Sequence, residues 1–186
     1  MTDSRFELYI QSIQKGDKSG LKEIYEEYGK TIYHVVLQIL HNPQDAEDVT
    51  SEFFIKLWNI ADTYCFGGKH KRWLMTIARN MAIDYIRKNR KEMLTLDNDY
   101  NDEDAIHNEI VDTVNTENEV VEKLSIKDAL QTLDESEREI VNMHLLAEMT
   151  FKDISEVLKK PLGTVSWKYR TALAKLRKTV KEVQMI

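Results

Sequence analysis

The chain is poor in residues that interrupt helices or cross-link loops. Its 186 residues include two prolines, six glycines and one cysteine, Cys65. So few prolines and glycines argue against a turn-rich β fold and favour helices. A single cysteine cannot form a disulfide within the chain, which suits a reducing compartment. We therefore expect an all-α, cytoplasmic protein.

Long apolar runs are also missing. No segment approaches the roughly 20 consecutive apolar residues that span a bilayer. The first residues, from Met1 to Ser4, show neither a basic region nor a following apolar region of a signal peptide. Hydrophobic residues nevertheless make up 42% of the chain, enough to fill helical cores. We expect no membrane insertion.

Motifs for catalysis or metal binding are absent as well. There is no nucleophile–base pair and no histidine or cysteine spacing typical of a metal site. Gly67-Gly68-Lys69 lacks the upstream glycine of a phosphate-binding P-loop. The acidic stretch 97–108 lacks the glycine and the final glutamate of a calcium-binding loop. We expect no enzyme activity and no cofactor.

The net charge of −6 conceals a strongly uneven distribution. Residues 97–122 hold ten acidic side chains and no lysine or arginine. Residues 69–91 carry eight basic side chains against Asp84, a local charge of +7, and residues 159–186 carry eight against Glu182, again +7. Local clusters of this kind, rather than the net charge, indicate binding to nucleic acid.

A helix-turn-helix pattern occupies residues 150–178. Thr150 is a suitable N-cap for the first helix, and Pro161 ends that helix. We expect Gly163 in the turn and Thr164 as the N-cap of the second helix. The apolar stripe of the second helix consists of Val165, Tyr169, Ala172, Leu176 and Val180. Its opposite face is polar and basic, as in a helix that enters a DNA major groove, although a hairpin with a solvated cationic face would look the same.

Helices are also expected over residues 5–14, 21–40, 69–91, 119–133 and 137–147, with another beginning after Asn42-Pro43. The core stripe of the helix over residues 21–40 includes Tyr25, and either Asp134 or Ser136 caps the helix over residues 137–147. The stretch from Glu92 to Glu122 lacks sustained periodicity and reads as a flexible, extended connector. We therefore predict helical domains at 1–92 and 123–186, joined by an acidic linker at 93–122.

Three segments of the N-terminal domain have a functional interpretation beside a structural one. The helix after Pro43 shows acidic and apolar residues outside its buried stripe, which is either a solvated face or a protein-docking surface. In the loop 63–69, Tyr64 and Phe66 either stack on unpaired bases beside Lys69 or plug the end of the domain. On the helix 69–91, Asn80 and its basic neighbours either contact DNA or form a solvated face.

Three segments together resemble a bacterial extracytoplasmic-function sigma factor of RNA polymerase. They are, in order, DAEDVTSEFFIKLW, RWLMTIARNMAIDYIRKNR and ALQTLDESEREIVNMHLLAEMTFKDISEVLKKPLGTV. The resemblance covers both predicted domains and implies a subunit that binds core polymerase and directs promoter recognition, DNA melting and transcription initiation. It implies core polymerase (clamp helices and flap), duplex and melted promoter DNA and an anti-sigma factor as partners.

The resemblance also assigns residues to these contacts. Docking on the clamp helices would involve Asp48, Ser51, Glu52 and Phe54. The minus-ten element would meet Tyr64, Phe66, Lys69, Asn80, Asp84, Arg87 and Lys88. The minus-thirty-five element would meet Thr164, Ser166, Trp167, Lys168, Arg170, Thr171 and Lys175.

The chain departs from the family pattern in two of its motifs, and its connector is long and acidic for the family. Ser51 stands where the docking helix usually has glutamine, and Ser166-Trp167 stands where a basic residue and serine are usual. Trp167 therefore either contacts a thymine methyl or packs within the domain. The main alternative function is a stand-alone helix-turn-helix repressor or activator on palindromic duplex DNA. A helical adaptor without a DNA role would leave both +7 clusters unexplained.

Overall fold

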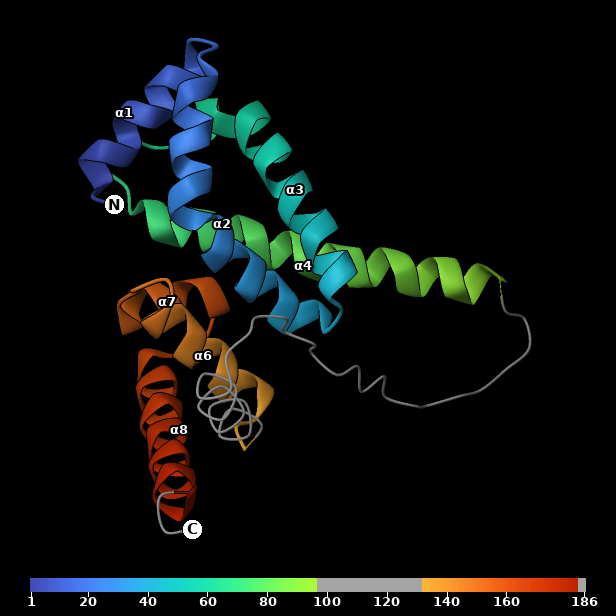
Figure 1. The fold of residues 1–186 in the computed structure, drawn as a ribbon, viewed down its shortest axis with the longest axis vertical. Helices are drawn as coiled ribbons and strands as arrows, with labels where there is room; N and C mark the ends of the chain where they lie inside the picture. Colours follow the sequence, from blue (N-terminus) through green and yellow to red (C-terminus); the bar gives the residue numbers. More distant parts are fainter. Residues whose placement is uncertain (97–131, 184–186) are drawn as a thin grey trace. The chain divides into compact units, whose positions relative to one another are not determined.

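The computed structural model describes residues 1–96 and 132–183, with side chains described at 1–90 and 132–179. Contacts along the chain divide it into two compact units, Met1–Ile110 and Val111–Ile186. All regular secondary structure in the described residues is helical, which confirms the all-α prediction (Figure 1). None of these helices is both long enough and apolar enough to cross a membrane.

In the N-terminal unit, the other α-helices pack around the helix over residues Lys18–Leu40. Its elements are α1 (Asp3–Gln14), α2 (Lys18–Leu40), α3 (Pro43–Ile60), the short 3-10 helix η1 (Ala61–Thr63) and α4 (His70–Leu96). Helix α2 packs against α1, α3 and α4. Asn42 caps α3 as expected, because its side chain accepts hydrogen bonds from the backbone N–H groups of Gln44 and Asp45.

The core of this unit follows the apolar stripes of its helices, with one clear exception. Phe6, Ile24, Phe53 and Leu74 are all fully buried. Tyr25, expected on the core side of α2, is instead exposed. A helix stripe about 100° wide leaves its edge positions to be decided by the neighbouring helices, and the sequence of α2 does not contain that information.

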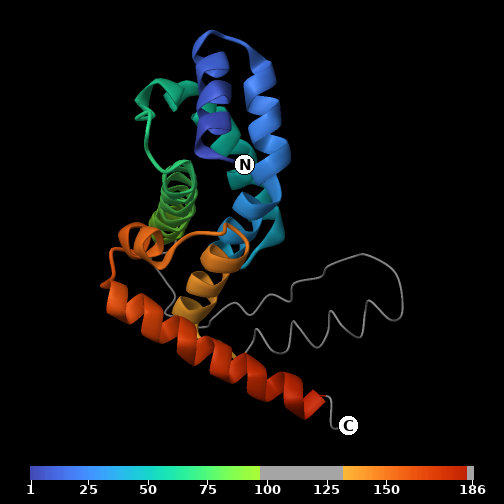
Figure 2. The ribbon, with the colours of Figure 1, turned by 90° about the vertical axis from the view of Figure 1, so that its left-hand side faces the viewer.

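The C-terminal unit consists of three described helices. Helices α6 (Glu135–Leu145) and α7 (Phe151–Leu158) pack against each other and against α8 (Leu162–Val183) (Figure 2). Leu133, Val141 and Ala172 form a buried cluster, and Tyr169 and Leu176 pack on it. The stripe predicted for the second helix therefore faces the core through Ala172.

The turn between α7 and α8 differs from the prediction. The left-handed residue is Lys159, with φ 53°, and Gly163 lies inside α8 without a positive φ. Helix α8 begins at Leu162, and the N–H of Val165 donates to the carbonyl of Pro161 at 3.1 Å. Thr164 is therefore in the first helical turn and is not the N-cap. Pro161 is compatible with this helix start because its fixed φ suits the beginning of a helix. The backbone N–H that proline lacks would have no hydrogen-bond partner there.

Two predicted segments meet the limits of the described residues. Helix α4 continues to Leu96, so the first residues of the predicted 93–122 linker are helical. The rest of the linker, and the helix expected over 119–133 up to residue 131, lie outside the described residues. The helix expected over 137–147 is α6, which begins two residues earlier. Its cap is Asp134, which forms a reciprocal capping box with Glu137.

Candidate nucleic-acid interface

The loop before α4 is anchored by Tyr64. This side chain is only 5% exposed, and its ring contacts Phe6 and Trp73 at centroid distances of 5.3 and 5.1 Å. Its hydroxyl donates to the carbonyl of Gly68 at 3.2 Å. Burial, with the nearby carboxylates of Glu7 and Asp3, raises the pKa of Tyr64 to about 12. Tyr64 thus occupies the plugging position that was one of its two interpretations.

Phe66, two residues later, lies on the outside of the same loop. Its side chain is 48% exposed, and its ring packs edge-to-face with that of Tyr64 at a centroid distance of 5.7 Å. Gly67 has φ 77°, a left-handed conformation that glycine adopts without strain, and its N–H donates to a carboxylate oxygen of Glu7 at 2.6 Å. The N–H of Gly68 also donates to the carbonyl of Cys65. The loop is therefore held at both ends while about half of the Phe66 side chain stays accessible.

His70 fixes the start of α4 beside this loop. It is buried, stacks on Phe6 at 4.8 Å, and bonds to the Tyr28 hydroxyl through Nε2 and to the Asp3 carboxylate through Nδ1. Burial lowers the pKa of His70 and outweighs the opposing effect of Asp3. We infer a neutral ring that donates from Nδ1 to Asp3 and accepts at Nε2 from Tyr28. The arrangement ties α1, α2 and α4 together.

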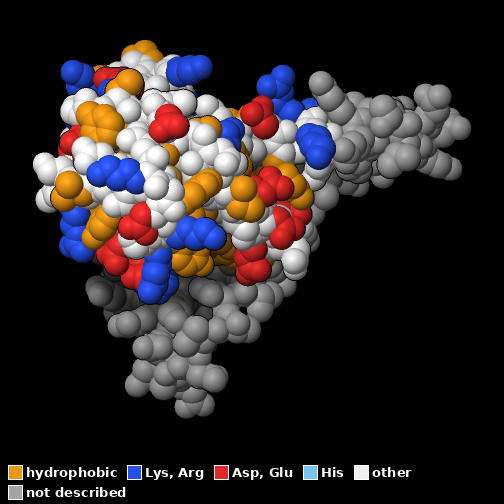
Figure 3. Space-filling view, turned by 90° about the horizontal axis from the view of Figure 1, so that it is seen from above, with side chains coloured by type: hydrophobic (Ala, Val, Ile, Leu, Met, Phe, Trp, Pro, Cys, Tyr) orange, Lys and Arg blue, Asp and Glu red, His pale blue; other side chains and the backbone are white. Residues whose placement is uncertain are grey.

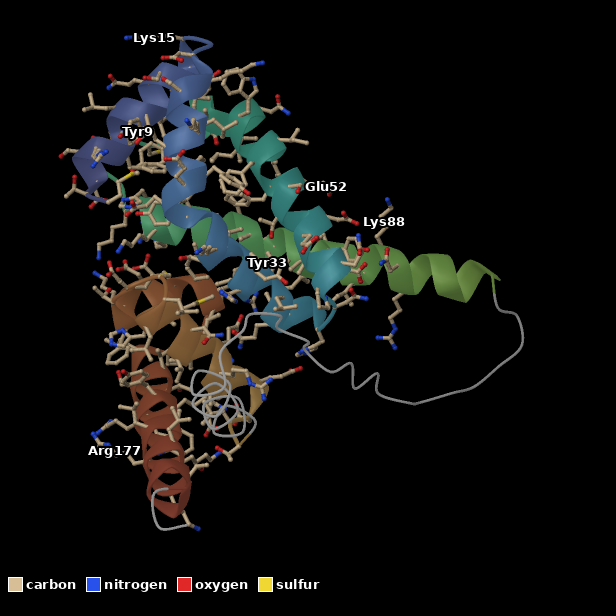
Figure 4. The ribbon with its side chains drawn as sticks, viewed as in Figure 1. Tyr9, Lys15, Tyr33, Glu52, Lys88 and Arg177 are labelled. Atoms are coloured by element: carbon tan, nitrogen blue, oxygen red, sulfur yellow. The ribbon has the colours of Figure 1, made fainter. Side chains whose placement is uncertain are left out.

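The outer face of α4 carries the remaining residues predicted at the minus-ten element. Asn80, Asp84 and Arg87 recur at spacings of four and three and are all exposed, so they share one side of the helix. Asp84 and Arg87 form a 3.5 Å ion pair that is about 70% exposed on both sides, and such pairs add little stability. Lys88 is also exposed, as Figure 4 shows. Lys69 is exposed at the end of the loop.

Only some of the residues predicted to form the docking surface on α3 are exposed. Asp48, Ser51 and Glu52 are exposed, and Glu52 projects away from α2 in Figure 4. Phe54 is 6% exposed and contacts the Tyr25 ring at 4.9 Å. It therefore lies beneath this surface, because its position on the helix turns it toward α2.

The exposed apolar side chain of this face is Ile55, at 65%. Figure 3 shows one face of the N-terminal unit, where hydrophobic side chains are interspersed with acidic and basic ones.

In the C-terminal unit, two of the lysines predicted at DNA have partners inside the protein. Lys168 Nζ lies 3.1 Å from a carboxylate oxygen of Asp134, and Lys175 Nζ lies 2.6 Å from one of Glu137. Glu137 is 3% exposed. Burial alone would raise the pKa of Asp134, but the Glu137 N–H and Lys168 bind the charged form and lower it. Both lysines thus attach α8 to the capping box of α6.

Other predicted residues lie on the outward side of α8. Trp167 is 59% exposed, and Thr164 and Arg170 are exposed as well. Ser166 and Thr171 are half-buried. The Nε–H of Arg170 donates to the carbonyl of Ser166 at 3.2 Å, and the Thr171 hydroxyl donates to that of Trp167 at 3.1 Å. This side of α8 therefore combines an indole, a guanidinium and three hydroxyls.

Comparison with known proteins identifies the family. Residues 24–92 match the model of Sigma-70 region 2, and residues 129–178 match that of Sigma-70, region 4. The chain belongs to the sigma-70 family. The resemblance stated from the sequence is thereby confirmed, and the protein is an RNA polymerase sigma factor of the ECF group.

Curated relatives place this sigma factor among ECF proteins. It is 29% identical over 181 residues to the ECF RNA polymerase sigma factor SigW of Bacillus subtilis, covering 94% of this chain and 96% of the relative. It is 29% identical over 139 residues to SigM of the same organism, covering 74% and 81%. Identity to BldN of Streptomyces coelicolor is 25% over 160 residues, covering 84% and 58%.

Solved structures show the same fold. CnrH, determined with the cytosolic domain of CnrY, gives a TM-score of 0.63 at 17% identity and covers 96% of this chain and 98% of that one. The sigma factor RpoE of Bartonella quintana, determined with the anti-sigma factor NepR, gives 0.62 at 21% identity and covers 88% and 98%.

Proposed function

We propose that this sigma factor binds core RNA polymerase in the cytoplasm, recognises promoters through its two helical domains and stabilises the opened strand. The N-terminal domain, residues 1–92, docks on polymerase and acts at the minus-ten element. The C-terminal domain, residues 123–186, holds the minus-thirty-five element, and the acidic stretch 93–122 links them. The chain supplies binding energy, and the polymerase supplies the chemistry.

Exposure of Phe66 on an anchored loop carries the proposal for strand opening. An unpaired base needs an aromatic face for stacking, worth about 1–3 kcal/mol per base. Phe66 offers such a face, whereas Tyr64 is buried and holds the loop in place. Little ordering entropy is lost on binding, because Gly67 and Gly68 already fix the loop through hydrogen bonds. We assign base capture to Phe66 and a positioning role to Tyr64.

Docking on polymerase uses the exposed part of α3. Asp48, Ser51 and Glu52 provide acidic and polar groups, and Ile55 provides an exposed apolar contact beside them. A basic, partly apolar partner surface complements this set. Phe54 contributes from beneath by supporting the helix. We expect the clamp helices of the polymerase to be this partner and the flap to receive the C-terminal domain.

An anti-sigma factor is the regulator we propose for this protein. RpoE of Bartonella quintana, which shares its fold, was solved with the anti-sigma factor NepR. A sigma factor whose docking surfaces are covered by another protein cannot bind polymerase. We propose that the anti-sigma factor covers the exposed face of α3, so that it and the polymerase bind one at a time.

Permanganate footprinting tests the proposal. It detects unpaired thymines near the start site in mixtures of promoter DNA, core polymerase and the full chain. We expect reactive thymines only when both proteins are present, and a strong reduction with Phe66→Ala. Reactivity that does not depend on the chain would contradict the function, and normal reactivity with Phe66→Ala would contradict the role of that ring.

A further inference from the structure

Trp167 is an exposed indole in the second turn of α8. Its side chain is 59% exposed, although leaving so large an apolar surface in water is unfavourable. Among the described residues, no aromatic ring packs against it. The opposite side of the helix is buried at Val165 and Ala172. Within the described part of the unit, most of the indole surface is therefore accessible to a partner.

The neighbours of Trp167 on the helix surface are small or hydrogen-bonding. Gly163 lies one turn before it, and no atom would come within 4 Å of a Cβ added there. Arg170 lies one turn after it and is exposed, and Ala174, exposed too, continues the same side. The absence of a side chain at Gly163 lets another surface approach the indole closely from that side. The Thr171 hydroxyl bonds to the Trp167 carbonyl and stays within the helix.

We propose that Trp167 contacts the C5-methyl group of one thymine in the minus-thirty-five duplex. In the major groove, the thymine methyl is the apolar group on a base edge, and apolar side chains read it. A recognition helix places its N-terminal turns against base edges. Arg170 then lies one turn further along, where it meets a guanine edge or a phosphate. This inference rests on the proposed function and adds a base preference to it.

Uracil substitution tests the contact directly. Deoxyuridine pairs like thymine but lacks the methyl group, so each thymine of the upstream element is replaced singly in a promoter used by the holoenzyme. Competition between modified and unmodified templates is measured in transcription with core polymerase and the full chain. For the wild type we expect one position at which uracil lowers relative affinity about fourfold, the value for burying one methyl-sized group.

The variants separate this contact from other roles of the indole. With Trp167→Ala, uracil at that position should have no further effect, whereas with Arg170→Ala the uracil effect should persist. Trp167→Phe, which keeps an apolar ring, should retain part of the uracil effect. Circular dichroism should show unchanged helix content, because the indole is exposed.

Two results would overturn the proposal. Uracil could be tolerated at every upstream thymine by the wild type, or Trp167→Ala could reduce binding to core polymerase and affect all templates equally. The latter would identify a protein contact instead. Transcription from the unmodified template depends on the chain in either case, so these failures are distinguishable from failure of the sigma-factor function.

Discussion

The cations of α8 have two different expected roles. Lys175, which is paired with Glu137, is expected to be structural, whereas Arg177 is expected to bind DNA. Lys175 Nζ lies 2.6 Å from a carboxylate oxygen of Glu137, whose side chain is 3% exposed, while the lysine side chain is 40% exposed. Arg177, two residues later, is exposed and projects from α8 on the side away from α6 (Figure 4). Lys175→Met and Arg177→Met remove one positive charge each and keep an aliphatic stem.

We expect Lys175→Met to act on stability. Removing one partner of a fully buried pair costs about 3–5 kcal/mol, and an exposed pair is worth about 0–1 kcal/mol. Because the lysine is partly solvated, a loss of about 1–3 kcal/mol follows for the C-terminal unit. For a unit of this size, each 1 kcal/mol lowers the melting temperature by roughly 4–8 °C. Arg177→Met should change stability by less than about 0.5 kcal/mol.

The salt dependence of promoter binding should respond to Arg177→Met and not to Lys175→Met. Each phosphate contact contributes about 0.9 to the slope of log affinity against log salt concentration. Arg177→Met should therefore lower the magnitude of that slope by about 1 in the holoenzyme, and Lys175→Met should leave it unchanged. Hydrogen exchange in the peptides of α6 and α8 of the full chain reports the stability of this unit separately from the other.

A charge-removing second substitution provides the control. Glu137→Gln combined with Lys175→Met removes the uncompensated buried carboxylate and should recover part of the lost stability. The reasoning would be refuted if Lys175→Met lowered the salt slope by about 1 without loosening α6 and α8. Lys175 would then contact DNA, as the family resemblance implies.

Three further predictions concern the N-terminal unit. Phe66→Ala should reduce permanganate-detected opening at least fivefold with little change in stability, whereas Tyr64→Ala should lower the unfolding free energy by roughly 3–5 kcal/mol; equal stability losses would contradict this. Gly20→Ala places a Cβ 2.4 Å from a carbonyl oxygen of α1 and should destabilise, while Gly29→Ala, with no contact under 3.6 Å, should stabilise by about 0.5–1 kcal/mol in chemical denaturation. Burial lowers the pKa of His70 below 6.5, so that, as the pH falls, His70 is protonated in the unfolded chain before it is protonated in the folded one. Stability should therefore fall as the pH drops below about 6.5, and an equally steep fall in His70→Gln would argue against this.

Local signals predicted the helices well because their causes are local. Asn42 caps α3 and Thr150 caps α7 through bonds to N–H groups two or three residues away. The prediction for the turn after α7 was wrong in detail because it placed Gly163 in the turn and Thr164 at the N-cap, whereas both lie inside α8. Lys159 adopts the left-handed conformation with φ 53°, and Pro161 sets the start of α8.

The candidate site depended on contacts between distant residues. Tyr64 and Phe66 are two positions apart in one loop, and sequence alone gives them the same chemistry. Burial of Tyr64 is decided by Phe6 and Trp73, and the loop is held by Glu7, 60 residues from Gly67. No pattern within the loop identifies those partners.

The lysines of α8 show the same limit. Lys168 and Lys175 lie 34 and 38 residues from the carboxylates that they bind. The Asp134–Glu137 capping box was partly visible in the sequence, since Asp134 was one of two expected caps. Its second function, holding α8, follows only from the packing of α6 on that helix. The roles of the remaining predicted residues at DNA and polymerase stay predictions.

Mapping of transcript 5′ ends on a genomic template tests the central claim most directly. Core polymerase is incubated with and without the full chain, and the start sites are compared. The sigma-factor function predicts a discrete set of starts that require the chain and share two upstream elements at constant spacing. Absence of any chain-dependent start, together with tight binding of the chain alone to palindromic duplex DNA, would contradict it and favour a stand-alone regulator.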